Sequence, residues 1–155
     1  MTVHEDETRA LQYELEVSID ADPATVWSAL TEDTDAWWLP DFHVVASDSV
    51  VSLDARAGGL LIEQQAGGAS LTWYQVQHCA PGEALHLVGY LSPDWGGPAT
   101  TMLSITLTAR EGGTTLRIRD ALFGMVSTDT AKSLESGWKQ LFGEGLARCA
   151  EAKAH

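Results

Sequence analysis

The sequence predicts an α+β domain in which a curved antiparallel sheet of six to seven strands wraps around a long C-terminal helix. Three observations predict this class: an alternating segment followed by a capped helix near the start, a central series of strands separated by glycine turns, and a C-terminal segment with a helical apolar stripe. Because a sheet and an amphipathic helix each have an apolar face, we expect the two faces to be buried against each other.

The first elements are a strand and two short helices. Residues 11–19, LQYELEVSI, alternate between apolar and polar with a period of two, which is typical of a strand. The helix that follows has Asp22 as its N-cap and Pro23 at its first position, and both residue types favour a helix start. Residues 33–38 predict a second short helix, which ends before Pro40 because proline cannot continue it.

The central region, residues 43–122, predicts consecutive strands separated by the turn sequences RAGG, AGGA, APGE and EGGT. Two of these turns predict register. With Pro81 and Gly82 as the centre of a turn, the predicted pairs are Val76 with Leu87, Tyr74 with Gly89 and His78 with Leu85. With Gly112 and Gly113 as a hairpin loop, the predicted pairs are Leu107 with Ile118, Ile105 with Asp120 and Leu103 with Leu122. Both hairpins therefore have one mostly apolar face, which also carries His78 and Asp120.

The C-terminal segment from residue 130 to residue 152 changes to a helical period. Its apolar positions follow the spacing i, i+4, i+7, i+8, i+11, i+12 and i+15, which makes a wide stripe on one long helix. The stripe consists of Leu134, Trp138, Leu141, Phe142, Gly145, Leu146 and Cys149.

Length and charge exclude several classes of protein. The 155 residues predict one domain, residues 11–152, preceded by a flexible tail at 1–10. The formal net charge of −13 repels phosphate backbones and anionic membrane surfaces, so nucleic acid is not an expected partner. No apolar run approaches the ~20 residues needed to span a bilayer and no secretion signal opens the chain, so we expect no membrane insertion and a cytoplasmic location.

Neither a metal nor a cofactor is expected. Cys79 and Cys149 are too few for a disulfide framework and lie in no CxxC motif, so both are expected to be reduced. His78, Cys79 and His86 are candidate metal ligands, but alternation on a strand sends His78 and Cys79 to opposite faces, so no metal site is expected. His86 is expected on the other face of the sheet, in contact with solvent.

Two features predict an interior that is not completely filled. His78 and Asp120 are polar residues among apolar neighbours, and burial of an unpaired charge costs several kcal/mol unless water or a ligand compensates it. Gly137, Gly143 and Gly145 each cost the final helix about 1 kcal/mol relative to alanine, which is consistent with a close approach or with room for a ligand.

The segment VSIDADPATVWSALTEDTDAWW resembles the opening of the SRPBCC superfamily, the START-related and pollen-allergen-like proteins with the helix-grip fold. Within it the chain is most similar to the branch named for activators of the 90-kDa heat-shock chaperone ATPase. The resemblance rests on GG at 58–59, PGEALHLVGY at 81–90, TTLRIRDALF at 114–123 and SGWKQLF at 136–142, and covers about residues 12–152.

The resemblance implies a cavity between the sheet and the final helix that holds a hydrophobic small molecule, lipid-like or aromatic. The candidate ligand-binding residues are Trp37, Trp38, Tyr74, Val76, His78, Leu87, Ile105, Ile118, Asp120, Trp138 and Phe142. One of Trp37 and Trp38 is expected in the core and the other near the cavity mouth. Trp95, in a loop rich in glycine and proline, is expected to cover the pocket, to form a dimer contact or to anchor its loop.

Other functions stay open. The resemblance also implies a module that binds a chaperone, and a homodimer is a further possibility. A cyclase- or hydrolase-like enzyme would need an acid or base in the cavity, and His78 and Asp120 are the only inward candidates, so the sequence favours a protein without catalysis. Members of the branch often have a histidine at the position of Asp120. The alternatives for Asp120 are a place in the cavity, an ion pair with an arginine such as Arg56, and a strand end open to water. His78 is either a hydrogen-bonding group for a ligand or a partly exposed residue near the hairpin tip.

Overall fold

The computed structural model describes residues 1–155 and contains one seven-stranded antiparallel sheet. The strand order is β1-β7-β6-β5-β4-β3-β2, so every neighbour except β1–β7 is also a neighbour along the chain. The strands are β1 (Arg9–Ile19), β2 (Val50–Leu53), β3 (Leu60–Gln64), β4 (Ser70–Ala80), β5 (Ala84–Leu91), β6 (Ala99–Arg110) and β7 (Gly113–Gly124). The predicted α+β class and the meander are confirmed.

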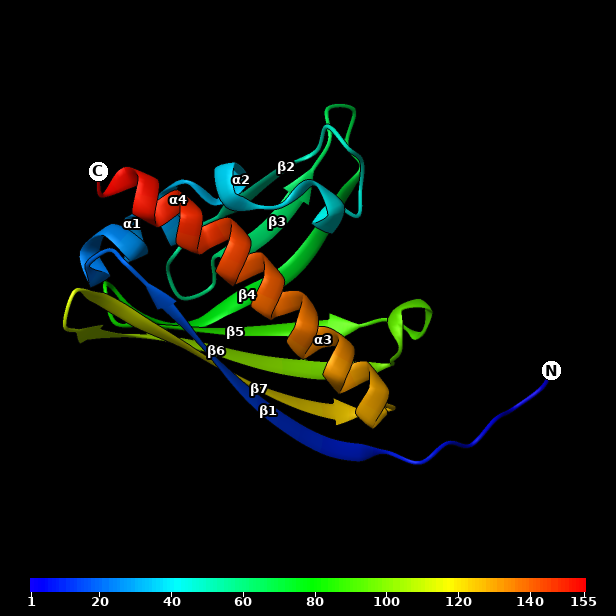
Figure 1. The fold of residues 1–155 in the computed structure, drawn as a ribbon. Helices are drawn as coiled ribbons and strands as arrows, with labels where there is room; N and C mark the ends of the chain where they lie inside the picture. Colours follow the sequence, from blue (N-terminus) through cyan, green and yellow to red (C-terminus); the bar gives the residue numbers. More distant parts are fainter.

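A long helical segment crosses one face of the sheet (Figure 1). It consists of α3 (Thr128–Gln140), a π-helical segment η3 (Leu141–Leu146) and α4 (Ala147–Lys153). The curved sheet wraps around this segment, which is the helix-grip arrangement that the sequence predicts. The face of the sheet turned away from α3, called the outer face below, carries no helix (Figure 1).

The short helices after β1 begin and end as the sequence predicts. In α1 (Pro23–Glu32), the side chain of Asp22 accepts a hydrogen bond from the Thr25 backbone N–H, and Pro23 occupies the first position. The second helix, α2 (Thr34–Trp37), ends before Pro40, which begins a 3₁₀ turn, η1 (Pro40–Phe42). Another 3₁₀ turn, η2 (Pro93–Trp95), connects β5 to β6.

The core lies between the inner face of the sheet and the C-terminal helical segment. The largest completely buried side chains come from both layers, which fits the predicted stripe on the helix and the predicted apolar face of the sheet. They include Ile19, Leu30, Leu85, Leu103, Ile105, Leu116, Ile118, Leu122, Leu141 and Leu146. None of the helices is long and apolar enough to cross a membrane.

The predicted β4–β5 register is right at one position and wrong at another. Val76 pairs with Leu87 as predicted, but His78 pairs with His86 instead of Leu85. The turn contains three residues rather than two, because Ala80 pairs with Ala84. A β-bulge then leaves Gln77 without a partner and restores the predicted register at Val76.

The predicted β6–β7 pairs are shifted by two residues. Leu107 pairs with Leu116, Ile105 with Ile118 and Leu103 with Asp120. The loop is formed by residues 111–112, because Gly113 already belongs to β7, where an added Cβ would overlap the carbonyl of Ile19. A shift of two residues keeps every side chain on its predicted face, so the prediction that Asp120 faces inward holds.

Candidate functional site

The space between the sheet and the helix, where the sequence predicts a cavity, is filled by aromatic rings. Trp37 packs against Trp38 and Phe142 with ring centroids 5.5 Å apart in both pairs, and Trp138 lies 5.7 Å from Phe142 and 6.0 Å from Tyr74. All five rings are at most 7% exposed. The enclosed cavity that remains among them has a volume of only about 20 Å³. The expected deep pocket is therefore closed by the protein's own side chains.

A larger cleft opens beside this core, and we call it the aromatic cleft. It has a volume of about 270 Å³ and is bounded by α3, the η1 turn and β4. Its lining residues are Trp38, Phe42, Trp73, Ser133, Leu134, Gly137 and Trp138. Ser133 supplies the only polar side chain apart from the indole nitrogens, and no charged residue lines it.

Gly137 leaves room on the helical side of the aromatic cleft. A Cβ at this position would lie 3.6 Å from the nearest atom of Phe42, an ordinary van der Waals contact, so glycine is not required by a clash. A longer side chain there would extend into the cleft.

Trp73 forms the opposite wall, and a second β-bulge puts it there. Leu61 pairs with Tyr74, but the next residue, Ile62, pairs with Thr72, so Trp73 has no partner in the ladder. Regular alternation would have placed Trp73 and Tyr74 on opposite faces. The bulge instead lets Trp73 pack edge-on against Trp38, with ring centroids 5.2 Å apart.

A buried carboxylate holds Trp73 in this position. Glu63 on β3 is completely buried, and its oxygens accept hydrogen bonds from the Trp73 indole N–H and the Ser49 hydroxyl. The backbone N–H groups of Val44 and Val45 also donate to it. Burial alone would raise the pKa of Glu63, but these donors outweigh burial and keep the pKa below its usual value. This site is not predictable from the residue pattern, because a single glutamate in an alternating strand predicts an exposed side chain.

Next to the aromatic cleft lies a smaller cavity of about 50 Å³, which has room for one or two water molecules. Trp95, 47% exposed in η2, is one of its lining residues. Tyr74, Thr101 and Trp138 form part of its inner wall. The Trp138 Nε1 atom is buried and has no hydrogen-bond partner.

Asp120 is hydrogen-bonded to Thr101 of this wall and to Tyr13. We call the group of Tyr13, Thr101 and Asp120 the polar cluster. The Tyr13 and Thr101 hydroxyls each donate to the Asp120 carboxylate at 2.6 Å. Asp120 is 2% exposed, and burial raises its pKa although both hydroxyls work against the rise. Burial and the neighbouring carboxylate also raise the pKa of Tyr13 and of Tyr74. The expected alternatives of an ion pair with Arg56 and of a strand end in water are both wrong, since Arg56 pairs with Asp54.

His78 does not belong to the site. It is exposed on the outer face beside His86, so its predicted place among the inward residues is wrong, and the bulge at Gln77 is the reason. Val76 and Ile118 are buried core residues that line none of these spaces. Leu87 and Ile105 border the small enclosed cavity. In the aromatic cleft, Trp38 and Trp138 are predicted ligand-binding residues and Gly137 is a predicted place of close approach or of room for a ligand, whereas Phe42, Trp73, Ser133 and Leu134 are not predicted from the sequence.

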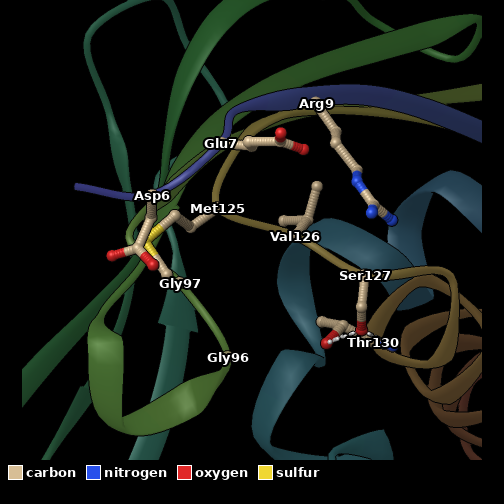
Figure 2. Close-up of a pocket in the computed structure, with 9 residues that line it drawn as sticks. All are labelled: Asp6, Glu7, Arg9, Gly96, Gly97, Met125, Val126, Ser127 and Thr130. Carbon is tan, nitrogen blue, oxygen red and sulfur yellow. Dashed lines mark hydrogen bonds between the residues drawn. The ribbon is translucent and has the colours of Figure 1, made fainter.

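A further cleft of about 440 Å³ lies near the start of α3 and is polar (Figure 2). Asp6, Glu7 and Arg9 of the N-terminal segment form one side, and Ser127 and Thr130 form the other. Ser127 caps α3 by accepting a hydrogen bond from the Thr130 backbone N–H. Because its polar groups are exposed or paired, this cleft shows no feature that selects a ligand.

The structure contains no cluster of three or more His, Cys, Asp or Glu side chains arranged to hold a metal ion. Cys79 and Cys149 are free thiols, and the Cys79 Sγ donates to the carbonyl of Ala55. The two buried acids, Glu63 and Asp120, each accept hydrogen bonds from neighbouring hydroxyl groups.

Comparison with known proteins shows the family to which this architecture belongs. Residues 20–151 match the sequence model of the family described as Activator of Hsp90 ATPase homolog 1-like protein. No curated protein sequence matches the chain.

Three solved structures show the same fold. A protein from Rhizobium leguminosarum is 15% identical, with a TM-score of 0.70 over 94% of this chain and 97% of its own. Ara h 8.0201 is 10% identical, with a TM-score of 0.65 over 94% of this chain and 98% of its own. The Aha1 dimer from Colwellia psychrerythraea is 17% identical, with a TM-score of 0.62 over 94% and 99%.

Proposed function

This chain belongs to the family of Activator of Hsp90 ATPase homolog 1-like proteins, and we propose that it binds a small, neutral, hydrophobic molecule with an aromatic ring in the aromatic cleft. The observation that carries the proposal is the composition of that cleft, in which three indoles and a phenyl ring surround about 270 Å³ of open space. Ligand pockets are concave and mostly apolar, with few polar groups.

The size and polarity of the cleft define the class of ligand. Its volume lies just below the ~300–1,000 Å³ of pockets for drug-sized molecules, which favours a ligand of one or two rings over a long lipid. Since no charged side chain lines the cleft, a charged ligand would lose hydration without gaining a partner there. The Ser133 hydroxyl offers one hydrogen bond to a polar substituent.

The test uses the neutral fluorescent probe N-phenyl-1-naphthylamine and two glycines of the same helical segment. Gly137→Leu fills the aromatic cleft, whereas Gly143→Leu is the matched control because a Cβ at Gly143 has no atom within 4 Å. We expect the wild type and Gly143→Leu to bind the probe with the same micromolar affinity, and Gly137→Leu to bind at least tenfold more weakly. Absence of binding to the wild type up to the solubility limit of the probe, or equal binding by both variants, would contradict the proposal.

A second function is favoured by a different observation. Tyr90, Met102 and Phe123 on the outer face are 75%, 57% and 63% exposed and occupy neighbouring strands. Exposed apolar groups of this kind are typical of protein contacts. Together with the family's description, they support a chaperone-binding module that uses the outer face. The check is binding to purified Hsp90 by the wild type and by a Tyr90→Ser, Met102→Ser and Phe123→Ser triple variant. Binding that is equal in both, or absent from both, would contradict this second function and leave the first unaffected.

A further inference from the structure

Two histidines lie side by side on the outer face, His78 on β4 and His86 on β5. They are direct cross-strand partners, with ring centroids 4.9 Å apart and ring planes inclined by 39°. His78 is exposed and His86 is half-buried. His43 is the only histidine whose side chain takes part in a hydrogen bond or an ion pair, so both of these rings are free to bind another group.

The pair exists because of the β-bulge at Gln77. Without the bulge, Val76 and His78 would lie two residues apart on the same face, and His78 would point into the core. The extra residue Gln77 reverses the face to which the next side chain points. His78 therefore pairs with His86, while Val76 still pairs with Leu87. Bulges often re-aim a single side chain in this way, and here the consequence is a surface imidazole pair.

We propose that His78 and His86 form a binding site for a divalent transition metal ion of the zinc, nickel and copper group. Imidazole nitrogen is a preferred ligand of these ions. With metal–nitrogen distances of about 2.0–2.1 Å, two nitrogens of a tetrahedral site lie roughly 3.3 Å apart. Rings whose centroids are 4.9 Å apart reach that separation by side-chain rotation, which the exposed position of His78 permits.

The surroundings of the pair determine the kind of site. No third His, Cys, Asp or Glu side chain completes a cluster, so two or more positions on the metal are left for water or for an outside ligand. Next to His86 lies the small Ser104, and the nearest cation along the row, Arg119, is paired with Glu14. The net charge of −13 attracts cations to the molecule as a whole. The site is thus an open, exchangeable metal site on the surface.

The test is a calorimetric titration of the full-length chain with NiCl₂ and with ZnCl₂. His4 and His155, near the two ends of the chain, are replaced by alanine in a reference protein so that they do not compete for the ion. We expect the reference to bind one ion per chain, and His78→Ala or His86→Ala to weaken binding at least tenfold. His43→Ala and Cys79→Ser should leave the affinity unchanged, because these side chains lie away from the pair.

A gain of affinity gives a second, independent measurement. Ser104 lies directly opposite His86 on β6, so Ser104→His adds a third imidazole on the same face. We expect this variant to bind Ni²⁺ and Zn²⁺ at least tenfold more tightly than the reference protein. A reference that binds no ion, histidine variants that keep the reference affinity, or a Ser104→His variant that gains nothing would overturn the proposal.

Discussion

Asp120 shows how a single buried carboxyl can be accommodated without a cation. Its two oxygens each accept a short hydrogen bond, one from Tyr13 and one from Thr101, in a place with 2% exposure. Hydroxyl donors cannot supply a full countercharge, so burial still raises the pKa of this group. The polar cluster therefore holds a buried acid within the sheet without an ion pair.

The raised pKa of Asp120 predicts a pH dependence of stability. Between the unfolded pKa near ~3.9 and the raised folded pKa, the folded state binds more protons than the unfolded state. This contribution to stability is complete below the unfolded pKa and is lost as the pH rises through the folded pKa. Asp120→Asn, whose amide imitates the protonated acid, should remove this contribution. The measurement is the difference in free energy of unfolding between wild type and variant at several pH values, and a constant difference would contradict the prediction.

The pKa of Glu63 is shifted in the opposite direction from that of Asp120. Its lowered pKa means that its contribution is present above the unfolded pKa near ~4.3 and is lost as the pH falls through the folded pKa. Glu63→Ala would leave several buried donors without an acceptor, at roughly 1–3 kcal/mol for each. We expect a loss of at least about 3 kcal/mol in urea denaturation at pH 7 and a smaller loss for Glu63→Gln, which keeps one acceptor. A loss below ~1 kcal/mol for Glu63→Ala would show that the network contributes little.

At the scale of the element, the π-helical segment η3 brings the C-terminal helix close to α2. Gly145 is buried there, and an added Cβ would overlap the backbone carbonyl oxygen of Trp37. Gly143, two residues earlier, faces open space. The three glycines of the helical segment therefore differ in why glycine is present. Gly145 allows a close approach of two backbones, Gly137 leaves space for the aromatic cleft, and Gly143 has no packing reason to be glycine.

This difference predicts opposite effects of the same substitution. Gly143→Ala should stabilise the protein by up to about 1 kcal/mol, because alanine has the higher helix propensity. Gly145→Ala should destabilise it by about 1–3 kcal/mol, because the backbones of η3 and α2 must separate. Chemical denaturation of the two variants beside the wild type is the check. Equal effects of the two substitutions would mean that the helix is not held against α2 at Gly145.

The elements also show what could be predicted from the sequence. The start of α1 was predicted correctly because Asp22 and Pro23 act within one turn of the chain. The strands were predicted from alternation, and the glycine turns placed them approximately. The two bulges in β4 were missed because they depend on how β4 pairs with β3 on one side, where Trp73 has no partner, and with β5 on the other, where Gln77 has none. Alternation within a single strand does not contain this information. The aromatic cleft was missed for the same reason, since its wall depends on the bulge at Trp73.

At the scale of the whole molecule, the dominant property is charge. Nine basic residues face 22 acidic ones, and the observed ion pairs, such as Arg110 with Asp20, are largely exposed. Exposed pairs contribute little, whereas the excess of negative charge repels itself in the compact state. Salt should therefore stabilise this protein.

The corresponding prediction concerns thermal unfolding at neutral pH. Raising NaCl from 10 mM to 500 mM shortens the Debye length from about 30 Å to under 10 Å, which screens most of the repulsion. Relief of about 1 kcal/mol would raise Tm by roughly 2–4 °C in a chain of this size. The control is the same titration near the isoelectric point of about 4.5, where the effect should vanish. A Tm at pH 7 that falls with salt would show that attractive pairs dominate.

Trp38, almost completely buried between Trp37 and Trp73, can also be regarded as a ligand that the chain carries by a covalent tether. Its indole N–H already donates to the carbonyl of Phe42. Replacement of Trp38 by glycine would cut this tether and leave a hole with the shape of indole, and free indole should refill it. The variant's Tm should then rise with indole concentration as for any ligand that binds only the folded state, and should rise more steeply than that of the wild type, which offers indole only the aromatic cleft. The interior of the protein thus holds its own indole in the place of a ligand. Chemical complementation is the way to remove this indole and to measure how tightly the interior binds it.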